Sequence, residues 1–150
     1  MIPYKLRPYT QADFEFVYRI KKIAYRPYVE KFWGAWDEEK QRVFFADFIK
    51  KVQNSLLIIE YKSSSIGIYH GDMTEPDIYE IGNIIVDPNH QGQGIGTDIL
   101  LNMIKKYSKV KMQLRVFKGN PAVDLYHRLG FMIVDETRTH YIMERNKANL

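Results

Sequence analysis

Three glycines at alternate positions, in the stretch QGQGIGT of residues 91–97, are the feature of this sequence that points most directly to chemistry. Glycine adopts positive φ angles and carries no Cβ, so another molecule can approach its main chain closely. The stretch leads into an amphipathic pattern typical of a helix, and the N–H groups at a helix N-terminus attract anions. We therefore predict that the main chain of this loop binds a pyrophosphate.

Two common phosphate-binding loops do not fit these residues. A dinucleotide-binding loop needs glycine at its first, third and sixth positions, but threonine stands at position 97, the sixth place counted from Gly92. A P-loop needs a lysine immediately before its serine or threonine, and here Gly96 precedes Thr97. The sequence therefore predicts a phosphate-binding loop of another kind.

The loop can be written Gln-x-x-Gly-x-Gly, with Gln91, Gly94 and Gly96 at the fixed places, and in this form it resembles the acetyl-coenzyme A signature of the GNAT acetyltransferases. A second stretch, NPAVDLYHRLGF at residues 120–131, is similar to the family's Asn-x-x-Ala-x-x-x-Tyr-x-x-x-Gly-Phe motif. It departs from that motif at Val123, because the alanine comes one residue earlier. The resemblance covers nearly the whole chain and is strongest over residues 80–131.

The resemblance implies which residues bind the coenzyme. Main-chain N–H groups of the glycine loop would hold the pyrophosphate, the strand before the loop would pair with the pantetheine arm, and Asn120 would hydrogen-bond that arm. The expected cofactor-binding residues are Ile84, Ile85, Val86, Gln91, Gly92, Gln93, Gly94, Ile95, Gly96, Thr97 and Asn120. Acetyl-coenzyme A is accordingly the expected co-substrate.

Acetyl transfer to an amine needs a neutral nitrogen, and a lysine-like amine with a pKa of about 10.4 is almost fully protonated at pH 7. A base or a desolvated site is therefore required, and the departing thiolate gains from a proton donor. The resemblance places Tyr126 near the thioester sulfur as a candidate acid; the alternative is a tyrosine of the core. Glu80, eleven residues before Gln91, has the spacing of the catalytic glutamate in histone-acetylating members. The alternatives are a solvent-facing glutamate, or a water chain held by Asp77 or Tyr79.

The acceptor is expected to bind the aromatic stretch AYRPYVEKFWGAWDEE at residues 24–39. Rings interleaved with carboxylates could form an aromatic wall with an anionic rim for a cationic amine. The candidate substrate-binding residues are Tyr28, Glu30, Trp33 and Trp36. The same rings could instead only cap a helix pair. The acceptor itself is expected to be a small-molecule or peptide amine, with a small soluble amine preferred.

Composition excludes several other classes of site and partner. The chain of 150 residues has no cysteine, so disulfides, thiolate metal sites and a cysteine nucleophile are excluded, and its four histidines lack metal-ligand spacing. A net charge of +4 without a long basic run does not support a nucleic-acid partner. No apolar run approaches the ~18 residues of a membrane span, so no membrane partner and a cytoplasmic location are expected. The sequence leaves open a monomer or a homodimer.

The elements that position these residues follow from hydrophobic periodicity. We expect a helix from Thr10 to Ala24, a loop over residues 25–36, and a second helix capped by Asp37. The expected apolar face of the second helix consists of Val43, Phe44, Phe48, Ile49 and Val52. Strands are expected over residues 4–10, 54–61, 65–70, 77–87, 111–117, 131–136 and 140–145, and further helices over residues 95–107 and 120–129.

This order predicts a single α/β (α+β) domain over residues 1–150, with a mixed, mostly antiparallel sheet of six to seven strands and about four helices on both faces. The passage from strand to helix to strand around residues 80–117 requires a parallel pair. The resemblance implies that the central strands splay to admit acetyl-coenzyme A. The last strand, residues 140–145, could pair across a dimer or lie alone at the sheet edge.

Several functions fit these observations. The favoured one is an N-acetyltransferase in which a primary amine attacks acetyl-coenzyme A directly in a ternary complex, because cysteine is absent and no serine has an evident base. A protein N-terminus or a lysine could replace a small amine as acceptor. Two alternatives belong to other classes of protein. One is a coenzyme-binding sensor module without transferase activity, and the other is a nucleotide-binding protein that uses the same N–H donors.

Overall fold

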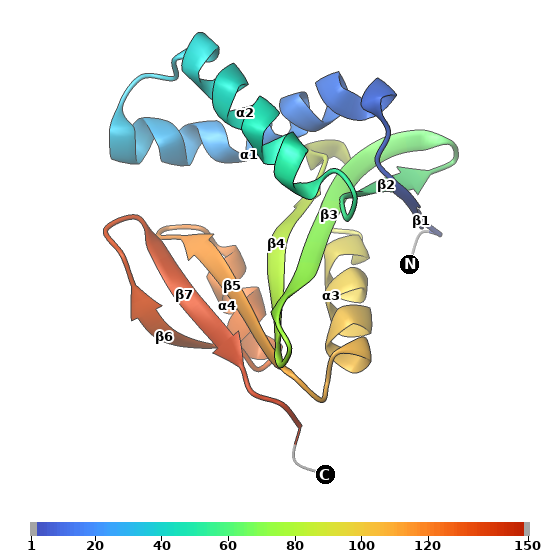
Figure 1. Cartoon of the computed structure of the whole chain (residues 1–150), viewed down its shortest axis with the longest axis vertical. Coiled ribbons are helices and arrows are strands. Elements are labelled where there is room, and N and C mark those ends of the chain that lie inside the picture. The colour runs from blue at the N-terminus through green and yellow to red at the C-terminus, as the bar shows by residue number, and fades with distance from the viewer. Residues whose placement is uncertain (1–2, 149–150) are drawn as a thin grey trace. The chain divides into compact units, whose positions relative to one another are not determined.

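The structure, a computed structural model, describes residues 3–148 (Figure 1). Its elements follow the predicted order: β1 (Lys5–Pro8), α1 (Phe14–Trp33), α2 (Glu38–Val52), β2 (Leu57–Tyr61), β3 (Ser64–Glu75), β4 (Ile78–Val86), α3 (Ile95–Lys106), β5 (Lys111–Phe117), α4 (Ala122–Arg128), β6 (Met132–Glu136) and β7 (His140–Arg145). Short 3-10 turns at Gln11–Asp13 and Pro88–His90 precede α1 and the glycine loop. Across residues 3–148, no helix has the length and apolar character needed to span a membrane.

The strands form one sheet in the order β1-β2-β3-β4-β5-β7-β6. The β4·β5 pair is parallel, while β1·β2, β2·β3, β5·β7 and β6·β7 are antiparallel. The predicted fold class and the parallel pair are therefore confirmed. The predicted place of the last strand is wrong, because β7 lies inside the sheet and β6 forms its edge. Burial explains the order, since Met143 of β7 is fully buried whereas every residue of β6 is exposed.

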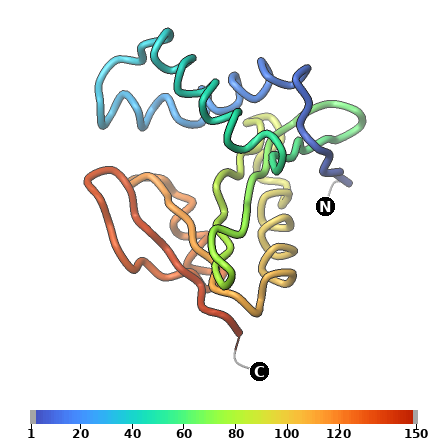
Figure 2. Tube along the Cα trace, in the orientation of Figure 1, coloured from blue at the N-terminus to red at the C-terminus, as the bar shows by residue number. Residues whose placement is uncertain are grey.

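The chain divides into two compact units. The first unit runs through His70 and includes Asn83–Gly96; the second comprises Gly71–Gly82 and the residues from Thr97 onward. In the first unit, α1 and α2 form an antiparallel helix pair, which the tube in Figure 2 follows. Their apolar faces share a core with the strands, made of Tyr9, Val17, Tyr18, Ile20, Phe45, Ile49, Leu56, Ile58, Ile68 and Ile85.

Helix α1 is longer than predicted, because it continues through Pro27 to Trp33 instead of ending near Ala24. Proline removes one main-chain donor and ends many helices, which is why the sequence favoured a loop here. Tertiary packing overrides that local preference, since Ala24 and the residue after it pack against the core of the first unit. The helix ends at Gly34, whose φ of 97° lies in the left-handed region that favours glycine at a C-terminus.

Helix α2 begins as predicted, because the Asp37 side chain accepts the main-chain N–H of Lys40 at 3.1 Å. Its predicted apolar face is partly wrong. Val43 and Phe44 are both 61% exposed, whereas Phe45 is buried, although the pattern did not include it. The buried stripe therefore contains Phe45, Phe48, Ile49 and Val52, which recur at the three- and four-residue spacing of one helix face.

In the second unit, alternate residues of β5 point to opposite faces of the sheet. Met112, Leu114 and Val116 are buried, and α3 and α4 cover their face. Tyr79, the cross-strand partner of Met112, stacks on Tyr107 just after α3 with ring centroids 3.7 Å apart. On the α4 side, the Arg145 Nε donates to the Leu129 carbonyl at 3.1 Å. The opposite face carries Glu80, Gln113 and Glu144 in register.

Candidate functional site

The glycine loop is an exposed bend between the end of β4 and the start of α3. Gly92 and Gly94 have φ angles of 78° and 83°, and a Cβ added at either would meet no atom within 4 Å. Main-chain conformation, not crowding, therefore requires these two glycines. Gly96 differs, because its φ is ordinary and an added Cβ would lie 3.9 Å from Ile84. The space beside it is open to a bound molecule.

The loop presents main-chain donors that the protein does not use. Among the residues described, no acceptor is assigned to the N–H groups of Gly92, Gln93 and Gly94. Residues 95–97 form the first turn of α3, where N–H groups have no partner within the helix. Ile95 itself is buried. Together with the helix dipole, these donors suit an anion.

Gln91 holds the base of the loop. Its main-chain N–H donates to the Pro88 carbonyl at 3.4 Å, and its side-chain Nε2 donates to the Val86 carbonyl at 2.7 Å. Asp87 fixes the turn between them, since its carboxylate accepts the Asn89 N–H at 2.9 Å. Gln91 thus orients the loop from within the protein, whereas the glycines that follow it are open.

Strand β4 brings residues 84–86 to the loop, and Gly67 of β3 allows the close approach of the two strands. A Cβ at Gly67 would lie 2.3 Å from the Ile85 carbonyl oxygen, so no other residue fits there. Gly67 was not among the predicted site residues, although a glycine inside a strand pattern is a signal of close main-chain approach. The parallel register with β5 ends at Ile81 and Leu114, before either strand ends.

A contact between α1 and β4 also escaped sequence analysis. The Tyr25 hydroxyl donates to the Asn83 side-chain oxygen at 2.6 Å, and Asn83 is one of few buried polar residues of the described chain. Asn83 directly precedes residues 84–86. No periodicity or motif could have paired residues 58 positions apart.

Tyr126 lies on α4 in the second unit and is buried, with its ring edge-on to Phe131 at 6.0 Å between centroids. Burial raises the pKa of Tyr126 to about 12, so the hydroxyl stays protonated at neutral pH. Asn120 precedes this helix, and its side-chain oxygen accepts the Ala122 N–H at 2.9 Å. Its side-chain amide nitrogen has no acceptor assigned within residues 3–148 and is free to donate to a ligand.

Glu80 lies on the sheet face of the second unit that α3 and α4 do not cover. Within the described chain no ion pair or hydrogen bond is assigned to its carboxylate. Glu144 of the same face differs, because it lies 3.4 Å from the Lys111 Nζ and accepts from the Gln113 side chain at 3.3 Å. The Tyr79 hydroxyl lies on the other face, 3.8 Å from the Met103 sulfur. Glu80 thus differs from Glu144 in having no assigned partner within the described chain.

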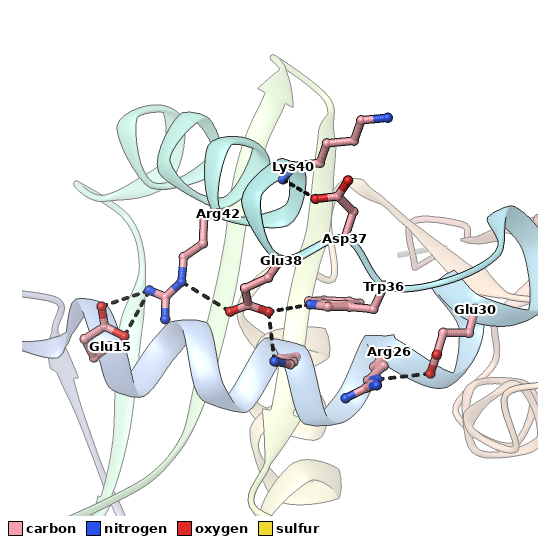
Figure 3. Close-up of polar contacts among 9 residues, drawn as sticks. Glu15, Arg26, Glu30, Trp36, Asp37, Glu38, Lys40 and Arg42 are labelled. Carbon is pink, nitrogen blue, oxygen red and sulfur yellow. Dashed lines mark hydrogen bonds and ion pairs between the residues drawn. The ribbon is translucent and has the colours of Figure 1, made fainter.

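The four predicted substrate-binding residues have different surroundings. Trp33 is 57% exposed and lines a cavity of about 560 Å³ between the end of α1 and the start of α2, together with Val29, Ala35, Asp37, Lys40, Gln41 and Phe44. Trp36 instead donates its indole N–H to Glu38 at 2.8 Å, and Glu30 pairs with Arg26 at 3.0 Å (Figure 3). Tyr28 is partly buried and does not line this cavity.

Glu38 is the centre of the polar contacts that join α1 to α2 (Figure 3). It accepts from the Lys22 Nζ and from the Trp36 indole, both at 2.8 Å. These hydrogen bonds, with the Lys22 bond the larger cause, lower the pKa of Glu38 to about 2. Arg42 bridges Glu38 and Glu15 on the same surface. Of the carboxylates predicted as an anionic rim, Glu30 pairs with Arg26 of its own helix and Asp37 caps α2, whereas Glu38, which was not predicted, joins the two helices.

Comparison with known proteins finds similar sequences and structures. The family model described as the acetyltransferase (GNAT) family matches residues 15–131. An uncharacterized N-acetyltransferase of Methanocaldococcus jannaschii is 28% identical over 144 residues, which cover 85% of this chain and 60% of the relative. The chain thus spans less than two thirds of that relative's length.

Solved structures show the same fold. The PaiA N-acetyltransferase of Thermoplasma acidophilum, in complex with coenzyme A, superposes with a TM-score of 0.71 at 17% identity, covering 97% of this chain and 99% of that one. Arabidopsis thaliana Naa50, in complex with a bisubstrate analogue of coenzyme A and a peptide, has a TM-score of 0.65 at 18% identity, covering 97% and 99%. With the family model matching most of the chain, the protein belongs to the acetyltransferase (GNAT) family.

Proposed function

We propose that this chain is an acetyl-coenzyme A-dependent N-acetyltransferase that acetylates a primary amine. The observation that supports this most is the glycine loop, whose exposed N–H groups at residues 92–94 have no acceptor in the described chain of a GNAT-family protein. Acetyl-coenzyme A is the co-substrate, and the PaiA relative is itself a coenzyme A complex. Because the family model runs through both units, residues 1–150 would act as one acetyltransferase domain.

The coenzyme would bind along β4 and the loop. The pyrophosphate would accept hydrogen bonds from residues 92–97, and the pantetheine arm would pair with the main chain of residues 84–86. Asn120 would donate its side-chain amide to a carbonyl of the arm, since its oxygen is already engaged by α4. Gln91 contributes by holding the loop to the end of β4.

The reaction would proceed by direct attack of the amine nitrogen on the thioester carbonyl. Glu80 would take the proton of the attacking amine, directly or through a water, because its carboxylate has no partner within the described chain. Tyr126 would donate a hydrogen bond to the departing sulfur. A phenol with a pKa of about 12 does not fully protonate a thiolate whose thiol has a pKa near 8.5, so it would stabilise the thiolate and water would supply the proton.

The acceptor would be a small-molecule or peptide amine. The cavity beside Trp33 has mainly apolar walls, from Val29, Ala35 and Phe44 among others, and suits an apolar group on the acceptor. The Naa50 relative was captured with a peptide joined to coenzyme A, which keeps a peptide N-terminus in the range of acceptors to test.

A thiol-release assay tests the proposal. The protein is incubated with acetyl-coenzyme A and a panel of small amines and short peptides, and free thiol is followed with time. Release that depends on one class of amine supports an acetyltransferase. Coenzyme binding by calorimetry without release on any amine would favour the non-transferring module, and a larger rise of Tm with ATP than with acetyl-coenzyme A would favour a nucleotide-binding protein.

Two variants then assign the catalytic groups. Glu80→Gln should lower turnover on the order of 100-fold and remove the acid limb of the pH–rate profile, as expected for loss of a general base. Glu144→Gln is the matched control, because its carboxylate lies on the same face but is already paired. Tyr126→Phe should lower turnover while leaving coenzyme affinity nearly unchanged; full turnover in that variant would remove the assignment.

A further inference from the structure

Lys21 of α1 is a partly buried amine that the proposed reaction does not use. Its Nζ lies 3.4 Å from the centroid of the Phe48 ring and 5.2 Å from that of Tyr25. Within residues 3–148, no carboxylate or carbonyl is assigned to it as a partner. Lys22, the next residue, is different, because its Nζ lies 2.8 Å from Glu38. Lys21 therefore has aromatic neighbours where a lysine usually has an anion or water.

The surroundings of Lys21 make its neutral form accessible. Desolvation disfavours a charged amine, and ring faces compensate for only part of the lost hydration. Burial lowers the pKa of Lys21 to about 8. At pH 7 the Lys21 amine is then neutral in about one molecule in ten, whereas an ordinary lysine is neutral in roughly one molecule in a few thousand. Only the neutral amine is a nucleophile.

Contacts within the first unit link this amine, through Tyr25, to the thioester end of the proposed coenzyme site. Strand β4 runs toward the glycine loop, so an arm paired with residues 84–86 would have its pyrophosphate at the loop and its thioester toward Asn83. Asn83 accepts the Tyr25 hydroxyl at 2.6 Å. Tyr25 follows Lys21 by one helical turn, so the two share a side of α1.

The hydrophobic core of the first unit connects the rings beside Lys21 with strand β4. Ile85, the middle residue of the proposed arm-binding strand, is in the buried cluster against which Tyr25 and Phe48 pack. Those are the two rings that face the Lys21 amine. One cluster therefore connects the amine with the strand that would carry the acetyl group.

We propose that Lys21 is a self-acetylation site, at which the acetyl thioester bound by this chain acylates the chain's own amine. The inference rests on the proposed function, because it needs bound acetyl-coenzyme A. The neutral Nζ attacks the carbonyl carbon, the N–C bond forms and the C–S bond breaks. The nitrogen loses one proton to water and the sulfur leaves as a thiolate that takes one up, so the coenzyme departs as its thiol. The product is a neutral amide against the Phe48 and Tyr25 rings.

Site-resolved mass spectrometry tests the proposal on the wild-type chain. The protein is incubated with acetyl-coenzyme A without an added amine, and acetylation of each lysine is followed with time and pH. Lys21 should acquire an acetyl group at least about tenfold faster than its neighbour Lys22 at pH 7.5. Its rate should rise with pH up to about 8 and then level off. The initial rate per molecule should not depend on protein concentration.

Acetic anhydride serves as an acetyl donor that needs no coenzyme site. If the anhydride labels Lys21 with a midpoint near pH 8 but bound acetyl-coenzyme A does not label it, self-acetylation is overturned while coenzyme binding stands. Labelling of Lys21 no faster than Lys22, or at a rate that grows with protein concentration, also overturns it. Failure of the proposed function looks different, since calorimetry would then show no coenzyme binding. Lys21→Arg should abolish the label and leave coenzyme affinity unchanged.

Discussion

The glycine loop at residues 91–97 and the connection between α1 and α2 at residues 34–37 are both short exposed bends that contain positive-φ glycine. They differ in what happens to their polar groups. In the connection, Asp37 caps α2 and Trp36 donates to Glu38, so the groups satisfy one another. In the loop, successive N–H groups have no acceptor in the described chain. The loop therefore leaves main-chain donors open, whereas the polar groups of the connection mainly hold two helices together.

The largest effect that separates the two bends is expected from valine at their positive-φ glycines. Gly94→Val should weaken coenzyme binding roughly tenfold to 100-fold, because a β-branched residue at this φ carries about 1–3 kcal/mol of strain and the loop would relax out of its binding conformation. Gly34→Val has the same kind of strain at the end of α1 and is the control. Calorimetric titration with acetyl-coenzyme A measures the affinity of each variant. An equal loss of affinity in both variants would show that the glycine loop and the α1–α2 connection do not differ in coenzyme binding.

A smaller effect is expected at Trp33, which lines the cavity between α1 and α2. Trp33→Ala should raise the KM for an apolar amine about tenfold with little change in kcat or in the KM for acetyl-coenzyme A, because it removes one wall of the cavity. Steady-state kinetics with the best amine of the panel measures this. An unchanged KM would mean that the whole connection is structural.

Trp36 should behave in the opposite way. Trp36→Phe keeps an aromatic ring but removes the indole N–H that bonds Glu38, so the free energy of unfolding should fall by about 1 kcal/mol. The KM values for both substrates should not change. Urea unfolding measures the expected loss of stability, and steady-state kinetics on the same preparation measures the KM values. A changed KM without a loss of stability would instead support a role of Trp36 in acceptor binding.

The smallest expected effect is a pH dependence at Glu38. Its folded pKa of about 2 lies below the ordinary value of 4.5, so the stability it adds is present above about pH 4.5 and is lost as pH falls toward 2. Glu38→Gln should therefore flatten part of the decline in Tm between pH 5 and pH 2. Glu39→Gln, next in the same helix turn, should leave that decline as it is in the wild type.

The predicted coenzyme-binding and catalytic residues lie on the elements that the sequence anticipated, whereas the predicted acceptor residues differ in their surroundings. Residues 84–86 and the glycine loop follow one another along the chain, so a local pattern could group them. Tyr28, Glu30, Trp33 and Trp36 were grouped by their types, and on a helix successive residues point in different directions. Their roles depended on partners such as Glu38 that the pattern did not pair with them.

What the sequence determined by itself was local: the glycines that need positive φ, the Asp37 cap, the order of strands and helices, and the motif of the family. These follow from dihedral preferences and hydrogen bonds between residues close in the chain. The tertiary structure decided that α1 continues through Pro27, that Phe45 is buried in place of Val43 and Phe44, and that β7 lies inside the sheet. It also decided that Lys21 lacks an anion, because burial against distant residues outweighs local propensity wherever a core is shared.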